Sequence, residues 1–122
     1  KKEYTVLGYK GKQVRDNLHS FDLINCFWEY FKKPKKGEVY NIGGGRFSNC
    51  SIIEALNLVE KKANIKIKKI FQRKNRIGDH IWYVSDLDKF KSHYPKWKIN
   101  YTIEKIMEEM CQENYKKWSR NI

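Results

Sequence analysis

The sequence predicts an α/β protein in which short strands alternate with about four helices. Two observations favour this class. Apolar residues recur at helical spacing in several segments, and short runs of β-branched and aromatic residues lie between them. Such alternation is typical of βαβ units, but the predicted strands are few and short. They would form only a thin sheet, so we expect that sheet to need further protein elements beside it.

The strand signals are short and are interrupted by glycine. Gly8 and Gly11 mark a turn inside the first extended region, and three consecutive glycines close the second. In the third region, lysine alternates with apolar residues, which predicts a strand with one wet face. The predicted extended segments are residues 4–18 with their internal turn, then 38–42, 65–71 and 81–84.

The helix signals include caps as well as periodicity. Ser20 can cap the first helix and Pro34 ends it, while Ser51 and Glu54 have the spacing of a capping box. The predicted helices are residues 20–33, the segment after Ser51, a short helix that begins at Ser85 or Asp86 and stops at Pro95, and a long helix that Thr102 can cap.

The composition favours one domain. The 122 residues suit a single modest core. No apolar run of about 18 residues is present, and the first residues lack the apolar centre of a secretory signal, so we expect a cytoplasmic protein without membrane contact. The three cysteines, Cys26, Cys50 and Cys111, are far apart and show no metal-ligand spacing. We therefore expect neither a disulfide framework nor a metal site.

The formal net charge of +12 raises a second class of function, because a positive field attracts the phosphates of nucleic acids. The cations are mostly lysines, and they are scattered along the chain. Lysine acts as a point charge, whereas reading base edges favours the planar arginine side chain. We expect solvated lysines, and a basic nucleic-acid-binding module is the alternative.

The stretch "RIGD" at residues 76–79 suggests an anion site. Arginine donates several hydrogen bonds that match phosphate oxygens, and aspartate accepts from hydroxyl groups. Gly78 permits a tight turn, so Arg76 and Asp79 can face one cavity. The alternative is that these two side chains pair with each other in a surface loop, and the local pattern alone favours that alternative.

Four stretches in a fixed order favour the anion site over the surface pair. They are "VRDNLHSFDL" at 14–23, "EVYNIGGG" at 38–45, "RIGD" at 76–79 and "SDLDKFKSHYPKW" at 85–97. Together they resemble the carboxyl-terminal part of the extended short-chain dehydrogenase/reductase enzymes, the NAD-dependent nucleotide-sugar epimerases and dehydratases, and within them the branch that acts on CDP-sugars. The resemblance covers essentially the whole chain. It implies a carboxyl-terminal fragment of an extended Rossmann-type enzyme without a complete dinucleotide-binding sheet.

The resemblance implies roles for four residues. Arg15 and Arg76 would hold the diphosphate of a CDP-hexose, and Asp79 would accept hydrogen bonds from its ribose hydroxyls. Tyr83 matches a position that lines the sugar pocket in related epimerases.

Other residues of the same motifs are expected to have structural roles. Asp22 and Asp86 are interpreted as helix-start residues, and His19 as a hydrogen-bonding residue rather than an acid or base. Tyr101 and Lys105 have the spacing of the family's catalytic pair, but they lie after the VRD motif, whereas the family's pair precedes it. We therefore expect Tyr101 to pack and Lys105 to face solvent, with no catalytic residue in this chain.

The resemblance also implies what lies elsewhere. The family's GxxGxxG turn, which binds NAD, is not found here, and "GGGR" at 43–46 lacks its spacing. We expect these glycines to form turns, and we expect no cofactor or metal site in this chain. NAD would be bound by a separate amino-terminal domain, where it would oxidise the hexose at C2 to a ketone and then return the hydride.

Residues 1–122 would then be a single unit, the nucleotide-sugar-binding portion of an isomerase that is inactive alone. Residues 20–45 resemble the last helix and strand that pack onto the dinucleotide-binding domain. The expected partners are that domain, a CDP-hexose and further copies of the chain. A non-catalytic interaction domain derived from the enzyme is a further alternative.

Overall fold

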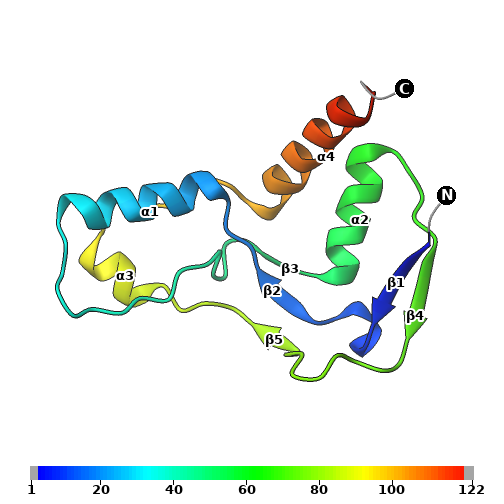
Figure 1. Cartoon of the computed structure of the whole chain (residues 1–122), viewed down its shortest axis with the longest axis horizontal. Helices are drawn as coiled ribbons and strands as arrows, with labels where there is room; N and C mark the ends of the chain where they lie inside the picture. The colour runs from blue at the N-terminus through cyan, green and yellow to red at the C-terminus, as the bar shows by residue number, and fades with distance from the viewer. Residues whose placement is uncertain (1–2, 120–122) are drawn as a thin grey trace.

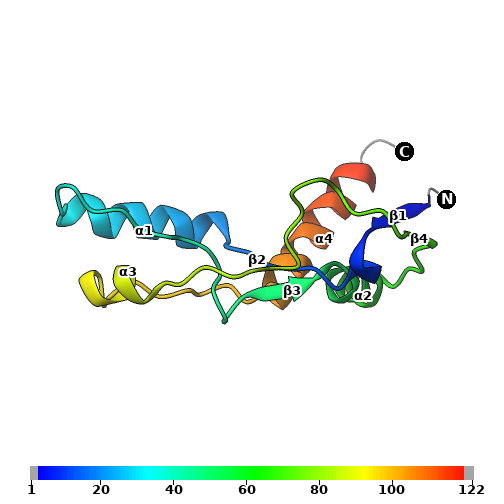
Figure 2. The same cartoon turned by 90° about the horizontal axis from the view of Figure 1, so that it is seen from below.

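The computed structural model describes residues 3–119. Strands and helices alternate in it, which confirms the α/β class with four α-helices among these residues. The molecule is elongated, with α1 and α3 at one end and β1 and β4 at the other (Figure 1), and the turned view in Figure 2 preserves this separation. The elements are β1 (Tyr4–Leu7), η1 (Tyr9–Gly11), β2 (Val14–Asp16), α1 (Ser20–Lys32), β3 (Asn49–Ser51), α2 (Ile52–Ala63), β4 (Lys69–Gln72), β5 (Trp82–Tyr83), α3 (Asp88–His93) and α4 (Ile103–Ser119).

The strands form two small sheets. β1 pairs in parallel with β4 in the first sheet. In the second sheet β2 is the middle strand, antiparallel to β3 and parallel to β5. The register places Arg15 of β2 beside Cys50 on one side and Tyr83 on the other. Three segments that are distant in the sequence therefore meet at Arg15.

One strand prediction is wrong and another is wrong in part. Residues 38–42 form no strand within the described chain, and the strand that follows is β3, at Asn49–Ser51. The strand predicted at 65–71 begins only at Lys69. β3 has little intrinsic strand preference, and it forms because β2 supplies its hydrogen-bond partners. Residues 38–42 have no such partner strand among residues 3–119.

The helix starts follow the predictions with two exceptions, α1 and α3, and α3 begins at Asp88 instead of Ser85 or Asp86. Ser51 and Glu54 form the complete capping box, with the Ser51 N–H and hydroxyl each donating to Glu54 Oε2 at 2.7 Å. These hydrogen bonds from Ser51 lower the pKa of the Glu54 carboxyl. The predicted Ser20 cap is wrong, because His19 occupies the cap position and its Nδ1 accepts from the Phe21 N–H at 3.1 Å.

The core lies in two places along the molecule. At one end, α1 and α3 enclose an aromatic cluster, in which Phe90 packs against Trp97 with the rings at 88°. At the other end, α2 packs against α4. Burial of the Cys26 thiol in the first cluster raises its pKa to about 11. The buried apolar residues of these two regions are Cys26, Leu87, Phe90, Tyr94 and Trp97, then Leu56, Ile103 and Ile106.

Asp22 and Asp86 have the structural roles that were expected. Asp22 is fully buried in the first turn of α1. Its carboxylate accepts from the backbone N–H of Asn100 and of Tyr101 at 3.0 Å and from the Asn100 amide at 2.8 Å. Asp86 accepts from the Asp88 N–H at 2.9 Å and so orders the start of α3. Asp22 thereby fixes the segment between α3 and α4 to α1.

We predict that Asp22→Ala lowers the free energy of unfolding by about 3 kcal/mol, because three donors lose a charged acceptor and two of them are backbone groups. Urea unfolding measures this loss. The matched control is Asp88→Ala, an exposed aspartate in a first helical turn, which should change the stability by less than about 1 kcal/mol. Equal effects of the two substitutions would contradict the proposed role of Asp22.

Candidate functional site

An ion pair between Arg15 and Asp79 joins β2 to the segment that follows β4. The Arg15 Nη2 lies 2.6 Å from Asp79 Oδ1, and Nη1 donates to the Val14 carbonyl at 2.7 Å. The Arg15 side chain is 36% exposed and that of Asp79 is 18% exposed. Because the pair is still open to solvent, it contributes little to stability and remains accessible to a ligand.

Arg76 reaches the same place through a tight turn. Gly78 has φ +76°, a left-handed conformation that favours glycine, and the Asp79 N–H donates to the Arg76 carbonyl at 3.2 Å. Arg76, Arg15 and Asp79 all line one hollow of about 190 Å³. Among residues 3–119 the ion-pair partner of Asp79 is Arg15, so the alternative in which Arg76 pairs with Asp79 is wrong.

The charge of this hollow suits an anion. Two guanidinium groups and one carboxylate face it, which leaves one net positive charge. The remaining lining residues are Tyr4, Thr5, Val6 and Leu7 of β1, with Gln13 and Ile52. The hollow is smaller than a typical ligand pocket of roughly 300–1,000 Å³. It can hold a diphosphate with part of a nucleoside, and a larger ligand would extend beyond it.

Tyr83 lies next to this hollow but is not among the residues that line it. It pairs in register with Arg15, and because side chains alternate along a strand, Tyr83 is on the same face of the sheet as Arg15. Trp82 pairs with Val14 and is on the opposite face. The ring of His80 lies edge-on to Tyr83, with the centroids 5.9 Å apart. The functional role of Tyr83 therefore stays a prediction.

Asp16 is a positioning residue that the sequence did not single out. Its Oδ2 accepts from the Gly45 N–H at 2.9 Å and from the Ser85 N–H at 3.0 Å. A Cβ at Gly43 would overlap Asp16 Oδ2, and a Cβ at Gly44 would overlap backbone carbonyls. Two of the three glycines thus permit close packing, and Gly45 forms the turn with φ +54°. The signal was present in the VRD motif, where Asp16 directly follows Arg15.

No family model matches the chain. CDP-paratose 2-epimerase of Salmonella typhi is 33% identical over 90 residues, which are 72% of this chain and 26% of the relative. A solved dTDP-glucose 4,6-dehydratase from Bacillus anthracis, in complex with NAD, superimposes with a TM-score of 0.77 and 26% identity over 94% of this chain and 35% of that one.

This chain is a relative of the NAD-dependent epimerases and dehydratases of the extended short-chain dehydrogenase/reductase family. UDP-glucose 4-epimerase from Bifidobacterium longum, solved with NAD+ and UDP, agrees, with a TM-score of 0.72 and 27% identity over 88% of this chain and 33% of that one. The chain spans about a quarter of the curated relative and about a third of these structures. It is thus a short α/β piece of the architecture of this family.

Tyr101 and Lys105, which have the family's catalytic spacing, lie in the surroundings that were expected for them. Tyr101 stacks on His19 with ring centroids 3.9 Å apart, and Lys105 is exposed. His19 Nε2 also lies 3.1 Å from Glu109 Oε2, so the ring links the start of α1 to α4. This confirms the structural interpretation of His19.

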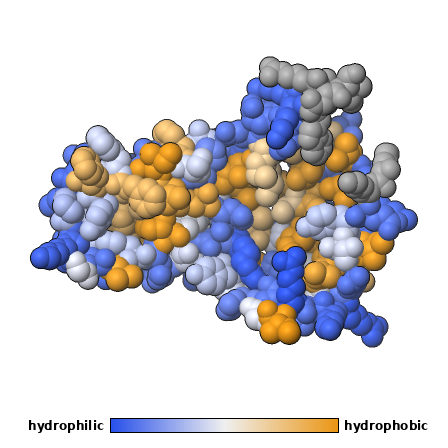
Figure 3. Space-filling view, in the orientation of Figure 1, coloured by the Kyte–Doolittle hydropathy of each residue, from blue (hydrophilic) through white to orange (hydrophobic). Residues whose placement is uncertain are grey.

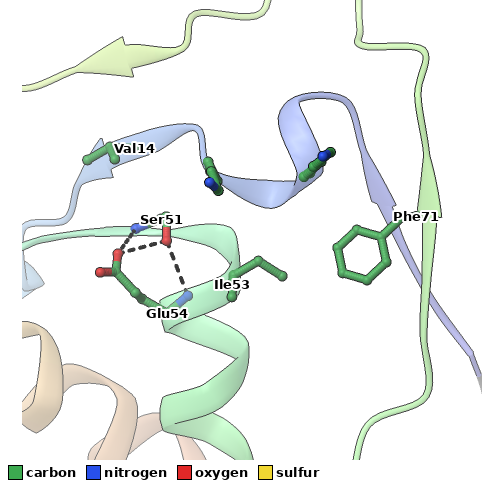
Figure 4. Close-up of a pocket in the computed structure, with 7 residues that line it drawn as sticks. Val14, Ser51, Ile53, Glu54 and Phe71 are labelled. Carbon is green, nitrogen blue, oxygen red and sulfur yellow. Dashed lines mark hydrogen bonds between the residues drawn. The ribbon is translucent and has the colours of Figure 1, made fainter.

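A larger cavity, of about 780 Å³, lies elsewhere, between η1, β4 and the start of α2. Figure 4 labels Val14, Ile53 and Phe71 among the residues that line it. The carboxylate of Glu54 accepts hydrogen bonds from Ser51. The acidic side chain that lines this cavity, Glu54, is therefore already hydrogen-bonded within the capping box. Size alone does not identify a binding site. Lys10 and Lys12 line this larger cavity, whereas the two guanidinium groups, whose planar donors match phosphate oxygens, are at the smaller hollow.

The described residues contain no group of three or more metal-ligating side chains. Between residues 3 and 119, no helix has the length and apolar character that would be needed to cross a membrane. The three cysteines are free.

Proposed function

We propose that this chain is the substrate-binding portion of an NAD-dependent nucleotide-sugar epimerase, a CDP-paratose/CDP-tyvelose 2-epimerase. The observation that carries the proposal is that Arg15, Arg76 and Asp79, which are far apart in the sequence, line the same hollow. The relative at 33% identity is named for a CDP-sugar, which supports the choice of base and sugar class.

Each group has a defined part in this proposal. Arg15 and Arg76 bind the diphosphate, because two planar guanidinium groups can donate to oxygens of both phosphates. Asp79 accepts hydrogen bonds from the ribose hydroxyls. Tyr83 lines the path of the sugar beyond the hollow, on the same face of the sheet as Arg15. The contribution of this chain is to bind and orient the substrate.

The glycines at residues 43–45 offer no open cradle for the pyrophosphate of NAD. The close approaches that Gly43 and Gly44 permit are filled by protein atoms, namely Asp16, Asn17 and Ser48, rather than left open for a pyrophosphate. We therefore assign NAD to a separate dinucleotide-binding domain, and no redox step to this chain.

The surface of α1 supports docking of residues 20–45 onto such a domain. Its buried side includes Asp22 and Cys26, whereas its large apolar side chains face solvent. Figure 3 shows apolar side chains over the α1 half of this face of the molecule. A helix that exposes so large an apolar stripe is typical of an interaction surface. The exposed residues are Phe21, Ile24, Phe27, Trp28 and Phe31.

We predict that the isolated chain binds a hydrophobic dye and self-associates through this stripe. The double substitution Phe27→Ser and Phe31→Ser should reduce both properties, as measured by dye fluorescence and analytical sedimentation. Phe71→Ser, at a half-exposed phenylalanine on β4, is the matched control. A compact monomer that binds no dye would contradict docking at α1.

The binding function is tested by titrating the chain with CDP, a CDP-hexose and a short oligonucleotide while recording tryptophan fluorescence. We predict weak binding of CDP and of the CDP-hexose, which Arg76→Ala weakens at least about tenfold because a charged hydrogen bond to phosphate is lost. Arg73→Ala, a nearby arginine that does not line the hollow, is the control and should bind CDP normally.

The other outcomes favour the other function classes. Salt-sensitive binding of the oligonucleotide without binding of CDP would support a nucleic-acid-binding module. Indifference to every ligand would support a non-catalytic interaction domain, and either result would overturn the proposal.

A further inference from the structure

The side chain of Gln13 lines the same hollow and has a fixed orientation. Gln13 is 4% exposed. Its Nε2 donates to the Leu7 carbonyl at 2.8 Å and lies 3.5 Å from Asp79 Oδ2. Turning the amide over would set its oxygen against these two acceptors, so the donor side of the amide must face Leu7 and Asp79.

The acceptor side of this amide has no partner. Gln13 Oε1 is buried and makes no hydrogen bond with any residue that the structure describes. A buried acceptor without a donor costs free energy, and such atoms are uncommon in folded proteins. Since Gln13 is itself one of the residues that line the hollow, together with Arg15 and Asp79, a ligand bound there can supply the missing donor.

We infer that Gln13 is a specificity-determining residue of the nucleotide site, and that its Oε1 accepts a hydrogen bond from the ligand. The inference rests on the proposed function and deepens it. A hydroxyl of the ribose and the exocyclic amino group of cytosine are both donors, whereas the corresponding oxygen of uracil is an acceptor and is rejected. Gln13 therefore selects for a donor group on the nucleoside.

The Arg15–Asp79 ion pair at the same hollow must rearrange when a diphosphate binds. In the chain alone, Arg15 is held by Asp79 at 2.6 Å. A diphosphate competes for the Arg15 guanidinium, since phosphate oxygens are strong acceptors of its hydrogen bonds. Release from Arg15 then frees the Asp79 carboxylate for the hydroxyls of the nucleoside, so diphosphate binding and nucleoside recognition are coupled.

The test compares the calorimetric affinities of three ligands, CDP, UDP and 2′,3′-dideoxy-CDP, for the unsubstituted chain and for Gln13→Met. The unsubstituted chain should bind CDP about tenfold more tightly than the ligand that lacks the recognised donor, which corresponds to one net hydrogen bond. Weaker binding of UDP identifies the cytosine amine as the donor. Weaker binding of the dideoxy compound identifies a ribose hydroxyl only where Gln13→Met reduces the difference, because Asp79 also accepts hydrogen bonds from the ribose in the proposed function.

The substituted chains separate recognition from folding. In Gln13→Met the tenfold preference should disappear, whereas Gln112→Met, at an exposed glutamine on α4, should keep it. A purely structural Gln13 would weaken all three ligands equally and leave the preference intact, which would overturn the inference. Equal affinities of the unsubstituted chain for the three ligands would also overturn it, whether or not Gln13→Met folds.

Failure of the inference can be told from failure of the proposed function. If the unsubstituted chain binds CDP and Arg76→Ala weakens that binding, but the preference does not depend on Gln13, only the inference is wrong. If the unsubstituted chain binds none of the three ligands, both are wrong.

Discussion

The hydrogen bonds of Asp16 are the constraint on which the candidate site depends. One carboxylate oxygen accepts from Gly45 and from Ser85, and so ties the end of β2 to two distant loops. The Ser85 bond helps to hold β5 alongside β2, and Gly43 and Gly44 let the other loop approach closely. Arg15 immediately precedes Asp16, so the same anchor that orders the sheet also fixes the backbone from which Arg15 reaches Asp79.

The candidate site shows what a sequence can predict about binding residues. The residue types and the glycine of "RIGD" predicted that Arg76 and Asp79 face one cavity, and they do. That Arg15 pairs with Asp79 could not be predicted from spacing, because 64 positions separate the two residues. The sequence did not point to Gln13 for a related reason. The fold buries its side-chain oxygen away from hydrogen-bond donors, and no local residue pattern indicates this burial.

The fold was predictable where local signals decide the structure. The capping box of α2 is such a case, because its hydrogen bonds join residues three apart. β3 was not predictable, since only pairing with β2 makes a strand of Asn49–Ser51. The apolar stripe of α1 predicted a helix correctly, but its periodicity could not show that this side faces solvent while Asp22 is buried.

If Arg15 and Arg76 bind one diphosphate together, both guanidinium groups must respond to the same ligand. NMR of the arginine Nε–Hε groups during addition of CDP to the chain measures this response. We expect the signals of Arg15 and Arg76 to shift along one binding curve, while those of Arg46 and Arg73, which do not line the hollow, stay in place. Shifts confined to Arg46 and Arg73, or no shift of Arg15 at saturating CDP, would contradict this joint binding.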